Sequence, residues 1–382
     1  MTLIKDEEAE RLIDSLNLKN PAQRIVNTYE AMNLISSEDV IAPADLPERD
    51  IAAQDGYAIN MADGCKNYTI KEKADELEPC EAVYVGTGWP VPPGTNSVVR
   101  MESAKVNGRA LTPVIDPRPG GDIERAGEDI RNGTTILRKG EIITPYHVSL
   151  LLAMNITKLK VFDLCAGIVS VGDEIVPYDS AKAGVRDSIT PLIKGILPFA
   201  RFREAHAPDS EPKIASAIRS LSESCDFIIT IGGSSVGKKD LTKKAIADIG
   251  EMVFEGVQTN VVKRGGVGLV NGVPVLALPG RIVSAVTVLH VHGLHILSRM
   301  VGRELRRFGV GTLAEGITVK HSMNSTYLFR VQGESLIPLK WGTGLYGQLI
   351  NADAFARLER DREYRKGEKL NFQYLIKNNC FI

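Results

Sequence analysis

The sequence of 382 residues lacks the long apolar runs and the charge imbalance that mark membrane and nucleic-acid-binding proteins. No apolar run approaches the roughly 20 residues that a membrane-spanning helix needs, so we expect no contact with a membrane. The first residues, MTLIKDEEAE, are acidic and have no signal-peptide core, which argues against export and for the cytoplasm. The net charge is only −1, so no overall positive field attracts nucleic acid.

Paired cysteine motifs are also missing. Five cysteines are scattered along the chain, and none forms a C-x-x-C pair. An odd, scattered set does not predict a disulfide framework. We therefore expect reduced thiols, as in most cytosolic proteins.

The length and composition predict a globular protein of two to four domains, because hydrophobic residues make up 43% and charged residues 24%. Helical spacing predicts a helix over residues 5–18, and a second short helix is expected within 21–45. From 46 to 118, short apolar runs between Gly and Pro clusters predict a small β-rich domain. A helical stretch near 145–155 suggests that the chain then returns to its N-terminal domain.

Residues 163–302 show the clearest pattern. Apolar runs (AGIVSV, FIITIGG, VPVLALPG) alternate with helix-like stretches, which predicts βαβ units and a mainly parallel sheet. Ligands of such sheets bind beyond the carboxyl ends of the strands. Gly-punctuated runs over 303–382 predict a small C-terminal β domain.

The strongest local signal for chemistry is the glycine-rich loop in DFIITIGGSSVGKKD, residues 226–240. Glycines let the backbone approach a ligand closely, and the following helix offers unpaired N–H groups, so the loop predicts a phosphate cradle. Its predicted phosphate-binding residues are Gly232, Gly233, Ser234, Ser235 and Gly237. The alternative is a tight strand-to-helix turn that needs glycine for its backbone alone.

The same loop nearly matches a P-loop. Gly232, Gly237 and Lys238 fit G-x-x-x-x-G-K, but Lys239 stands where a Ser or Thr would bind Mg²⁺. A nucleotide hydrolase of the P-loop class therefore remains one alternative.

Two more strand ends carry polar residues. Asp173 and Glu174 follow the strand that ends at Gly172, where metal-binding or proton-transfer carboxylates are placed in such sheets. Another strand breaks at Pro279 and Gly280, with Arg281 next in the chain, and Lys263 and Arg264 lie upstream. Together with Lys238 and Lys239, these cations could bind a pyrophosphate, although solvated surface charges would look the same in sequence. The histidines at 290, 292 and 295 do not share one helix face, so they do not predict a zinc site.

Six segments follow one another along the chain: DGYA at 55–58, GTGWPVPPGTNSVVRME at 86–102, AGEDI at 126–130, SVGDEIV at 170–176, GGSSVGKKD at 232–240 and LPGRIVSA at 278–285. Taken in this order, they resemble the MoeA and gephyrin E-domain family of molybdopterin molybdenumtransferases. The resemblance covers roughly residues 45–302.

The resemblance implies an α/β multidomain fold with a mainly parallel, MogA-like α/β sandwich at its centre. The expected domains are a discontinuous N-terminal helical domain of residues 1–45 and 119–162, a small β-rich domain of 46–118, an α/β molybdopterin-binding domain of 163–302 and a C-terminal β domain of 303–382.

It also implies a reaction in which molybdate is inserted into adenylylated molybdopterin with release of AMP, assisted by Mg²⁺. A homodimer is expected, with the partner's small β domain completing the site, and a MogA-like adenylyltransferase is an expected partner. Matched positions suggest catalytic residues Asp55, Glu174 and Asp240, metal ligands Asp173, Glu174 and Asp240, and ligand-binding residues Thr87, Asp129, Asp187, Lys263, Pro279, Gly280 and Arg281, besides the glycine loop.

The chain departs from the family pattern at several positions of this expected site. Lys238 replaces an acid, Ile189 and Arg281 replace amides, and Ile282 replaces a proline. Of the family's Pro-Gly-Lys-Pro segment only Lys263 remains, between Val262 and Arg264. Added cations favour anion binding and weaken metal handling. A molybdopterin- or nucleotide-binding paralogue or scaffold, without metal transfer, is therefore the second reading of the sequence.

Overall fold

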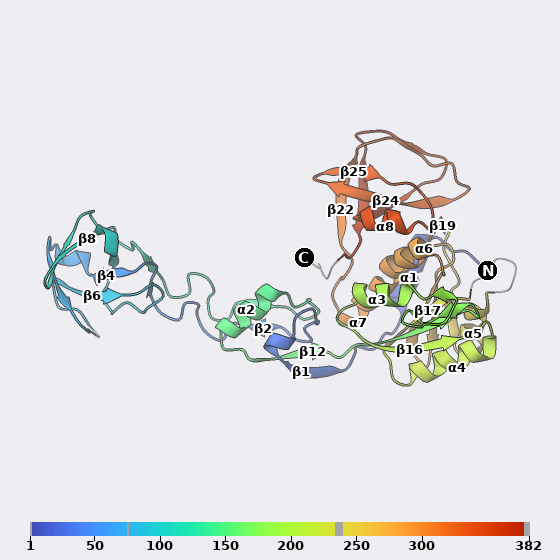
Figure 1. The fold of residues 1–382 in the computed structure, drawn as a ribbon, viewed down its shortest axis with the longest axis horizontal. Coiled ribbons are helices and arrows are strands. Elements are labelled where there is room, and N and C mark those ends of the chain that lie inside the picture. Colours follow the sequence, from blue (N-terminus) through green and yellow to red (C-terminus); the bar gives the residue numbers. More distant parts are fainter. Residues whose placement is uncertain (1, 75, 234–239, 378–382) are drawn as a thin grey trace. The chain divides into compact units, whose positions relative to one another are not determined.

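The computed structural model describes residues 2–74, 76–233 and 240–377, which form two compact units (Figure 1). The larger unit contains residues 1–38, 138–148 and 157–382, and the smaller unit contains 39–137 and 149–156. The chain therefore leaves the larger unit and returns to it twice. The predicted boundaries between four domains stay predictions, because internal contacts divide the chain only into these two units.

A six-stranded sheet forms the centre of the larger unit, in the order β16-β13-β17-β21-β20-β18. Its strands are β13 (Cys165–Val171), β16 (Arg201–Ala207), β17 (Phe227–Gly232), β18 (Glu251–Phe254), β20 (Gly266–Val270) and β21 (Val273–Leu278). The first four strands of the order are parallel to their neighbours, and β20 and β18 add antiparallel pairings. The predicted mainly parallel α/β domain is confirmed.

Helices cover both faces of this sheet (Figure 1). They are α3 (Ile189–Ile196), α4 (Glu211–Ser222), α5 (Leu241–Ile249), α6 (Ile282–Val288) and α7 (Leu294–Val301). Neighbouring side chains of a strand point to opposite faces. Accordingly, Phe227 and Ile229 pack in the core with α3, α6 and α7, whereas Ile228 packs in the core with α4 and α5. Burial on both faces explains why these strands are nearly continuous apolar runs.

The longest helical stretch, residues 282–301, joins α6 to α7 through a π-helical turn at Leu289–Gly293. It is long and apolar enough to cross a membrane, yet 89% of its apolar window is buried inside the protein. The stretch is therefore the central core helix of this unit.

A β module follows at the C-terminal end of the larger unit. Its strands are β22 (Phe308–Leu313), β24 (Asn324–Gln332), β25 (Ser335–Pro338), β26 (Ala354–Leu358) and β28 (Lys369–Tyr374), with β19 (Thr259–Asn260) at the edge. A further pairing of β24 with β26 closes the five C-terminal strands into a ring. The short helix α8 (Tyr346–Asn351) lies between β25 and β26. The predicted C-terminal β domain is confirmed.

The N-terminal part of the larger unit contains α1 (Asp6–Ser15) and the antiparallel pair β1 (Gln23–Asn27) and β12 (Lys158–Phe162). The short helix expected within 21–45 is present only as a 3-10 turn at Thr28–Glu30. Residues 23–27 before it are extended, because they pair with a strand more than 130 residues away in sequence. Two small pairs complete the unit, namely β14 (Ile175–Val176) with β15 (Val185–Arg186), and β23 (Ile317–Thr318) with β27 (Glu363–Tyr364).

The smaller unit contains a second six-stranded sheet, in the order β7-β4-β6-β5-β9-β8. Its strands are β4 (Gly56–Ile59), β5 (Tyr68–Lys71), β6 (Glu81–Val85), β7 (Ser97–Arg100), β8 (Ala104–Asn107) and β9 (Ala110–Pro113). Two short pairs also belong to this unit, β2 (Val40–Ile41) with β11 (Thr135–Leu137) and β3 (Ile51–Ala52) with β10 (Ile123–Glu124). The helix α2 (Pro145–Ala153) begins in the residues of the larger unit and ends in those of the smaller one.

A disulfide joins Cys65 to Cys80 in the smaller unit. The expectation of five reduced cysteines was therefore wrong for this pair. Spacing alone does not reveal the pair, because it depends on β5 and β6 lying side by side. Cys165 and Cys225 are buried free thiols in the larger unit.

Candidate functional site

A cavity of about 720 Å³ opens at the carboxyl ends of β13, β17 and β21. The helices that follow β13 and β17 lie on opposite faces of the sheet, because α3 and α5 belong to different cores. The loops after these two adjacent strands therefore diverge and leave a crevice between them. Such a point, where the connections change sides, is where open α/β sheets bind ligands.

Glycines shape the floor of this cavity after β17. Gly232 and Gly233 have φ angles of 89° and 71°, in the left-handed region that favours glycine. A Cβ atom on Gly233 would lie 2.1 Å from the Thr242 hydroxyl oxygen, and one on Gly232 would lie 2.8 Å from the Val171 carbonyl oxygen. Both glycines line the cavity, so a ligand there meets backbone rather than side chains. The rest of the predicted cradle, Ser234, Ser235 and Gly237, and the departure Lys238, lie outside the described residues.

Glu174 supplies a carboxylate to the cavity wall after β13. Its side chain is exposed and has no hydrogen-bond or ion-pair partner among the residues that the structure describes. Asp173, next to it, turns away, since its carboxylate accepts a hydrogen bond of 3.2 Å from the Asp209 backbone N–H. Asp209 itself lines the cavity from the end of β16.

Asp187 lines the cavity, yet its carboxylate is engaged by α3. It accepts hydrogen bonds from the backbone N–H groups of Ile189 and Thr190 at 3.1 and 3.0 Å, and from the Thr190 hydroxyl at 2.7 Å. The side chain is only 7% exposed. Its contacts satisfy the free donors of the first helical turn. Ile189 is 6% exposed and belongs to the core, which accounts for an apolar residue at this position.

Asp240 begins α5 and does not line the cavity. Its carboxylate accepts a hydrogen bond of 3.2 Å from the Lys243 backbone N–H and lies 2.9 Å from the Lys243 ammonium. Within the described ranges, no group of three or more His, Cys, Asp or Glu side chains is placed to hold a metal ion. The metal site predicted from Asp173, Glu174 and Asp240 therefore stays a prediction.

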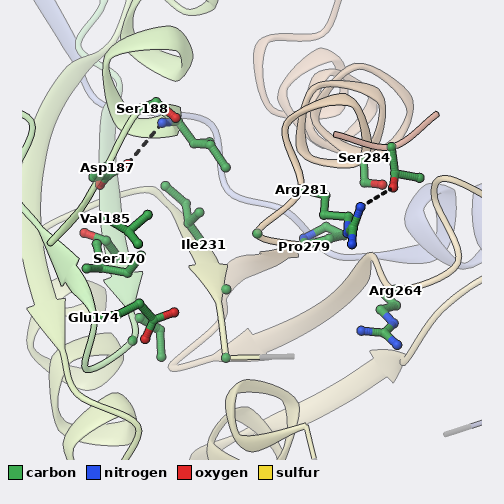
Figure 2. Close-up of a pocket in the computed structure, with 18 of the residues that line it drawn as sticks. Ser170, Glu174, Val185, Asp187, Ser188, Ile231, Arg264, Pro279, Arg281 and Ser284 are labelled. Carbon is green, nitrogen blue, oxygen red and sulfur yellow. Dashed lines mark hydrogen bonds between the residues drawn. The ribbon is translucent and has the colours of Figure 1, made fainter. Parts of the chain in front are cut away.

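Cations occupy the wall opposite Glu174 and Asp187. Figure 2 shows Arg264 and Arg281 on this side, with Ile231 at the end of β17 between the two walls. Lys263 and the backbone of Pro279 and Gly280 also line the cavity here, as predicted from the sequence. Of the predicted residues, the cavity is lined by Glu174, Asp187, Gly232, Gly233, Lys263, Pro279, Gly280 and Arg281. Glu174 faces the basic residues across it. Ile282, the last departure, is 2% exposed and packs in the core.

Three residues that the sequence linked to this site, Asp55, Thr87 and Asp129, belong to the smaller unit. One Asp55 oxygen accepts hydrogen bonds from the Thr87 backbone N–H at 2.7 Å and from its hydroxyl at 2.8 Å. These bonds stabilise the carboxylate and lower the pKa of Asp55. Asp129 is exposed elsewhere in the same unit. Asp55 and Thr87 are exposed as well, and this pair is the Asp55 surface.

Sequence reasoning missed several residues of the cavity wall: Ser170, Arg186, Asp209, Asn260, Thr343 and Tyr346. Asp209 follows β16, whose sequence RFREAHA is not an apolar run, so the sequence predicted no strand before it. Thr343 and Tyr346 come from the C-terminal β module. The sequence around them contains no pattern that predicts their position at the cavity.

Two family models match the chain. The family model for the MoeA N-terminal region (domain I and II) matches residues 4–155, and that for a probable molybdopterin binding domain matches residues 167–299. A putative molybdopterin biosynthesis protein of Methanocaldococcus jannaschii is 28% identical over 96% of each chain. A molybdopterin molybdenumtransferase of Haemophilus influenzae is 24% identical over 94% of this chain and 95% of its own.

Solved structures show the same fold. A molybdopterin biosynthesis MoeA protein from Pyrococcus horikoshii superposes with a TM-score of 0.78 at 23% identity, covering 98% of this chain and 100% of its own. The two family models match successive parts of the chain in the order that the six motifs predict. The chain therefore belongs to the MoeA and gephyrin family.

Proposed function

We propose that this chain is a molybdopterin molybdenumtransferase, which inserts molybdate into adenylylated molybdopterin and releases AMP. The observation that carries the proposal is the cavity at the crevice between β13 and β17, with a glycine-lined floor, the Glu174 carboxylate on one wall and cations on the other. Relatives that match nearly the whole chain bear the name of this enzyme or pathway. Such a cavity suits a ligand that contains a phosphoanhydride.

The chain's own residues would bind and orient the pyrophosphate. Gly232 and Gly233 allow phosphate oxygens to approach the backbone. Lys263 and Arg281 would neutralise phosphate charge, which increases as the phosphoanhydride P–O bond breaks and AMP leaves.

The carboxylates fit Mg²⁺ only together with the ligand. Asp240 is paired with Lys243 and Asp173 accepts from Asp209, so Glu174 is the carboxylate of the predicted set that faces the cavity unpaired among the described residues. Magnesium commonly binds through one or two carboxylates and substrate phosphates, which Glu174 and a pyrophosphate would supply. When bound there, the ion would stabilise the negative charge of the phosphoanhydride.

AMP release tests this proposal directly. Purified protein with adenylylated molybdopterin, Mg²⁺ and molybdate should release AMP and yield molybdenum cofactor. Glu174→Gln should slow release by about a hundredfold, since it removes the charge that holds the ion. Glu223→Gln, an exposed site at the end of α4, is the matched control and should change nothing. Unchanged release in Glu174→Gln would contradict the role of Glu174.

Binding without metal insertion is the second candidate function. Its support is the placement of Ile189 and Ile282 in the core, where the resembled family has polar or proline positions, together with the added cation Arg281. Ligand binding with no AMP release would favour this reading. ATP hydrolysis without any pterin would favour the P-loop reading instead.

We propose further that the chain acts in the cytoplasm as a homodimer, in which the Asp55 surface of one copy serves the cavity of the other, and that it receives its substrate from a MogA-like adenylyltransferase. Mixing two inactive variants tests the dimer. Asp55→Asn and Glu174→Gln chains, unfolded and refolded together, should regain about a quarter of the normal AMP release, because half of the dimers then hold one intact site. No recovery in verified mixed dimers would contradict action between copies.

A further inference from the structure

The segment between β25 and α8 forms part of the cavity wall, although it belongs to the C-terminal β module. It is fastened on two sides. The Val283 backbone N–H donates to the Thr343 carbonyl oxygen at 3.1 Å, next to the end of β21. The Tyr346 hydroxyl lies 2.8 Å from the Ser188 hydroxyl, at the start of α3. The C-terminal module therefore presents residues 343–346 to the cavity in a defined position.

Tyr346 lines the cavity with an aromatic side chain that remains largely exposed. The residue is 54% exposed, although it lines the cavity and its hydroxyl is held by Ser188. A tyrosine fixed at its tip offers rigid aromatic surface at a small cost in conformational entropy. Stacking of one base on such a ring strengthens binding by about tenfold or more.

Arg281 lies beside the same segment. Its Nη1 donates to the Thr343 hydroxyl oxygen at 3.3 Å, an interaction drawn in Figure 2. A guanidinium has five N–H donors, so most of them remain available to a ligand. Its planar fork suits a phosphate, which it can bind through two parallel hydrogen bonds. The resembled family has an amide here, so this cation is a feature of this chain.

We propose that Tyr346 and Arg281 together determine which ligand enters: Tyr346 stacks on a planar nitrogen heterocycle, and Arg281 binds the phosphate attached to it. The inference deepens the proposed function, on which it rests for the class of ligand. Adenine and pterin are both planar heterocycles that carry phosphate in an adenylylated pterin, so the test must separate them.

The test measures dissociation constants of the full chain by titration calorimetry with AMP, with 6-hydroxymethylpterin phosphate and with ribose 5-phosphate, which has no heterocycle. Tyr346→Leu should weaken binding of at least one heterocyclic phosphate about tenfold or more and leave ribose 5-phosphate unchanged. The heterocycle that is affected identifies the one that stacks. Tyr346→Phe keeps the ring and should retain most of the affinity.

Arg281→Asn, which restores the amide of the resembled family, should weaken all three ligands about tenfold and reduce the salt dependence of binding. Ile350→Ala is the matched control, because Ile350 is 78% exposed one turn further along α8 and does not line the cavity. Equal thermal unfolding midpoints would show that the variants fold.

The proposal is overturned if the wild type binds none of the three ligands, or if Tyr346→Leu leaves both heterocyclic phosphates unaffected or weakens ribose 5-phosphate equally. Self-association lost in both Tyr346→Leu and Ile350→Ala, with unchanged ligand binding, would instead assign the α8 surface to an interface and would overturn the proposal too. Ligand binding that depends on Tyr346, without AMP release in the reaction assay, would leave this inference standing and contradict the transferase activity.

Discussion

The Asp240 carboxylate lies 2.9 Å from the Lys243 ammonium, and the lysine side chain is only 5% exposed. The pair lies at the start of α5, where Asp240 also accepts from the Lys243 backbone N–H. The two atoms form an ion pair without good hydrogen-bond geometry, and the ammonium nitrogen has no other hydrogen-bond partner among the described residues. Asp240 therefore already neutralises a buried cation. If it also acts in catalysis and metal binding, as predicted, the same carboxylate must pair with Lys243 at the same time.

Removing either partner should be far more harmful than removing both. Asp240→Asn should lower the free energy of unfolding by about 3–5 kcal/mol, because it leaves a buried ammonium unpaired. The double variant Asp240→Asn with Lys243→Met should recover most of this loss. Urea unfolding of the single and double variants measures the coupling. Equal losses in Asp240→Asn and in the double variant would show that the pair does not stabilise the fold.

Two buried histidines on the core helix should make the protein sensitive to acid. Burial lowers the pKa of His290 to about 4 and that of His292 to about 3. In the unfolded chain histidines titrate near 6.5, so below that pH the unfolded state binds protons that the folded state does not. Stability should therefore fall as the pH drops from 6.5 toward 4, by about 1.4 kcal/mol per pH unit for each histidine.

The variant His292→Leu isolates one of these contributions. Neither ring nitrogen of His292 has a hydrogen-bond partner among the described residues, so the change removes a titrating group without breaking a polar contact. Its unfolding free energy should vary less steeply with pH over that range. His206→Gln, at an exposed position, serves as the control and should keep the wild-type slope. A wild-type slope in His292→Leu would assign the acid sensitivity to other groups.

The sequence could predict the central sheet and the edge at which the site lies. Apolar runs ending near Gly172, Gly232 and Pro279 predicted buried parallel strands, and the structure pairs them in parallel. Parallel strands bring their carboxyl ends to one edge of the sheet. Lys263, Arg281 and Glu174 therefore meet at one cavity as expected. The order of the six motifs along the chain predicted the MoeA and gephyrin family.

The remaining features depend on contacts that spacing does not contain. Tyr346 reaches the cavity only because the C-terminal module packs against the start of α3. Asp187 and Asp240 matched family motifs, yet local helix ends engage their oxygens in this structure. Residues 23–27 form a strand because a distant segment pairs with them, and no local pattern contains that pairing.

The disulfide between Cys65 and Cys80 should stabilise the smaller unit. It closes a loop with a sequence separation of 15 residues, for which chain-entropy arguments give about 3 kcal/mol. Reductant should therefore increase hydrogen exchange of β5 and β6 in the wild type, and it should have no further effect in Cys65→Ser. Cys225→Ala removes a free thiol of the larger unit and is the control, in which reductant should increase the exchange of β5 and β6 as in the wild type. Alkylation of both thiols in freshly purified, unreduced protein would contradict the pairing.

Asp187 offers a test of whether a residue shared with the family acts on the ligand or on the helix. Its two oxygens accept three hydrogen bonds from the first turn of α3. Asp187→Ala should therefore lower the free energy of unfolding by about 1–2 kcal/mol, whereas Asp187→Asn retains an acceptor and should lose less than about half of that. Urea unfolding measures both, and AMP release measured at a temperature where both variants are fully folded separates the roles. If Asp187→Asn is as stable as the wild type yet releases AMP far more slowly, then the carboxylate charge acts on the ligand, and helix capping does not explain its presence in the cavity.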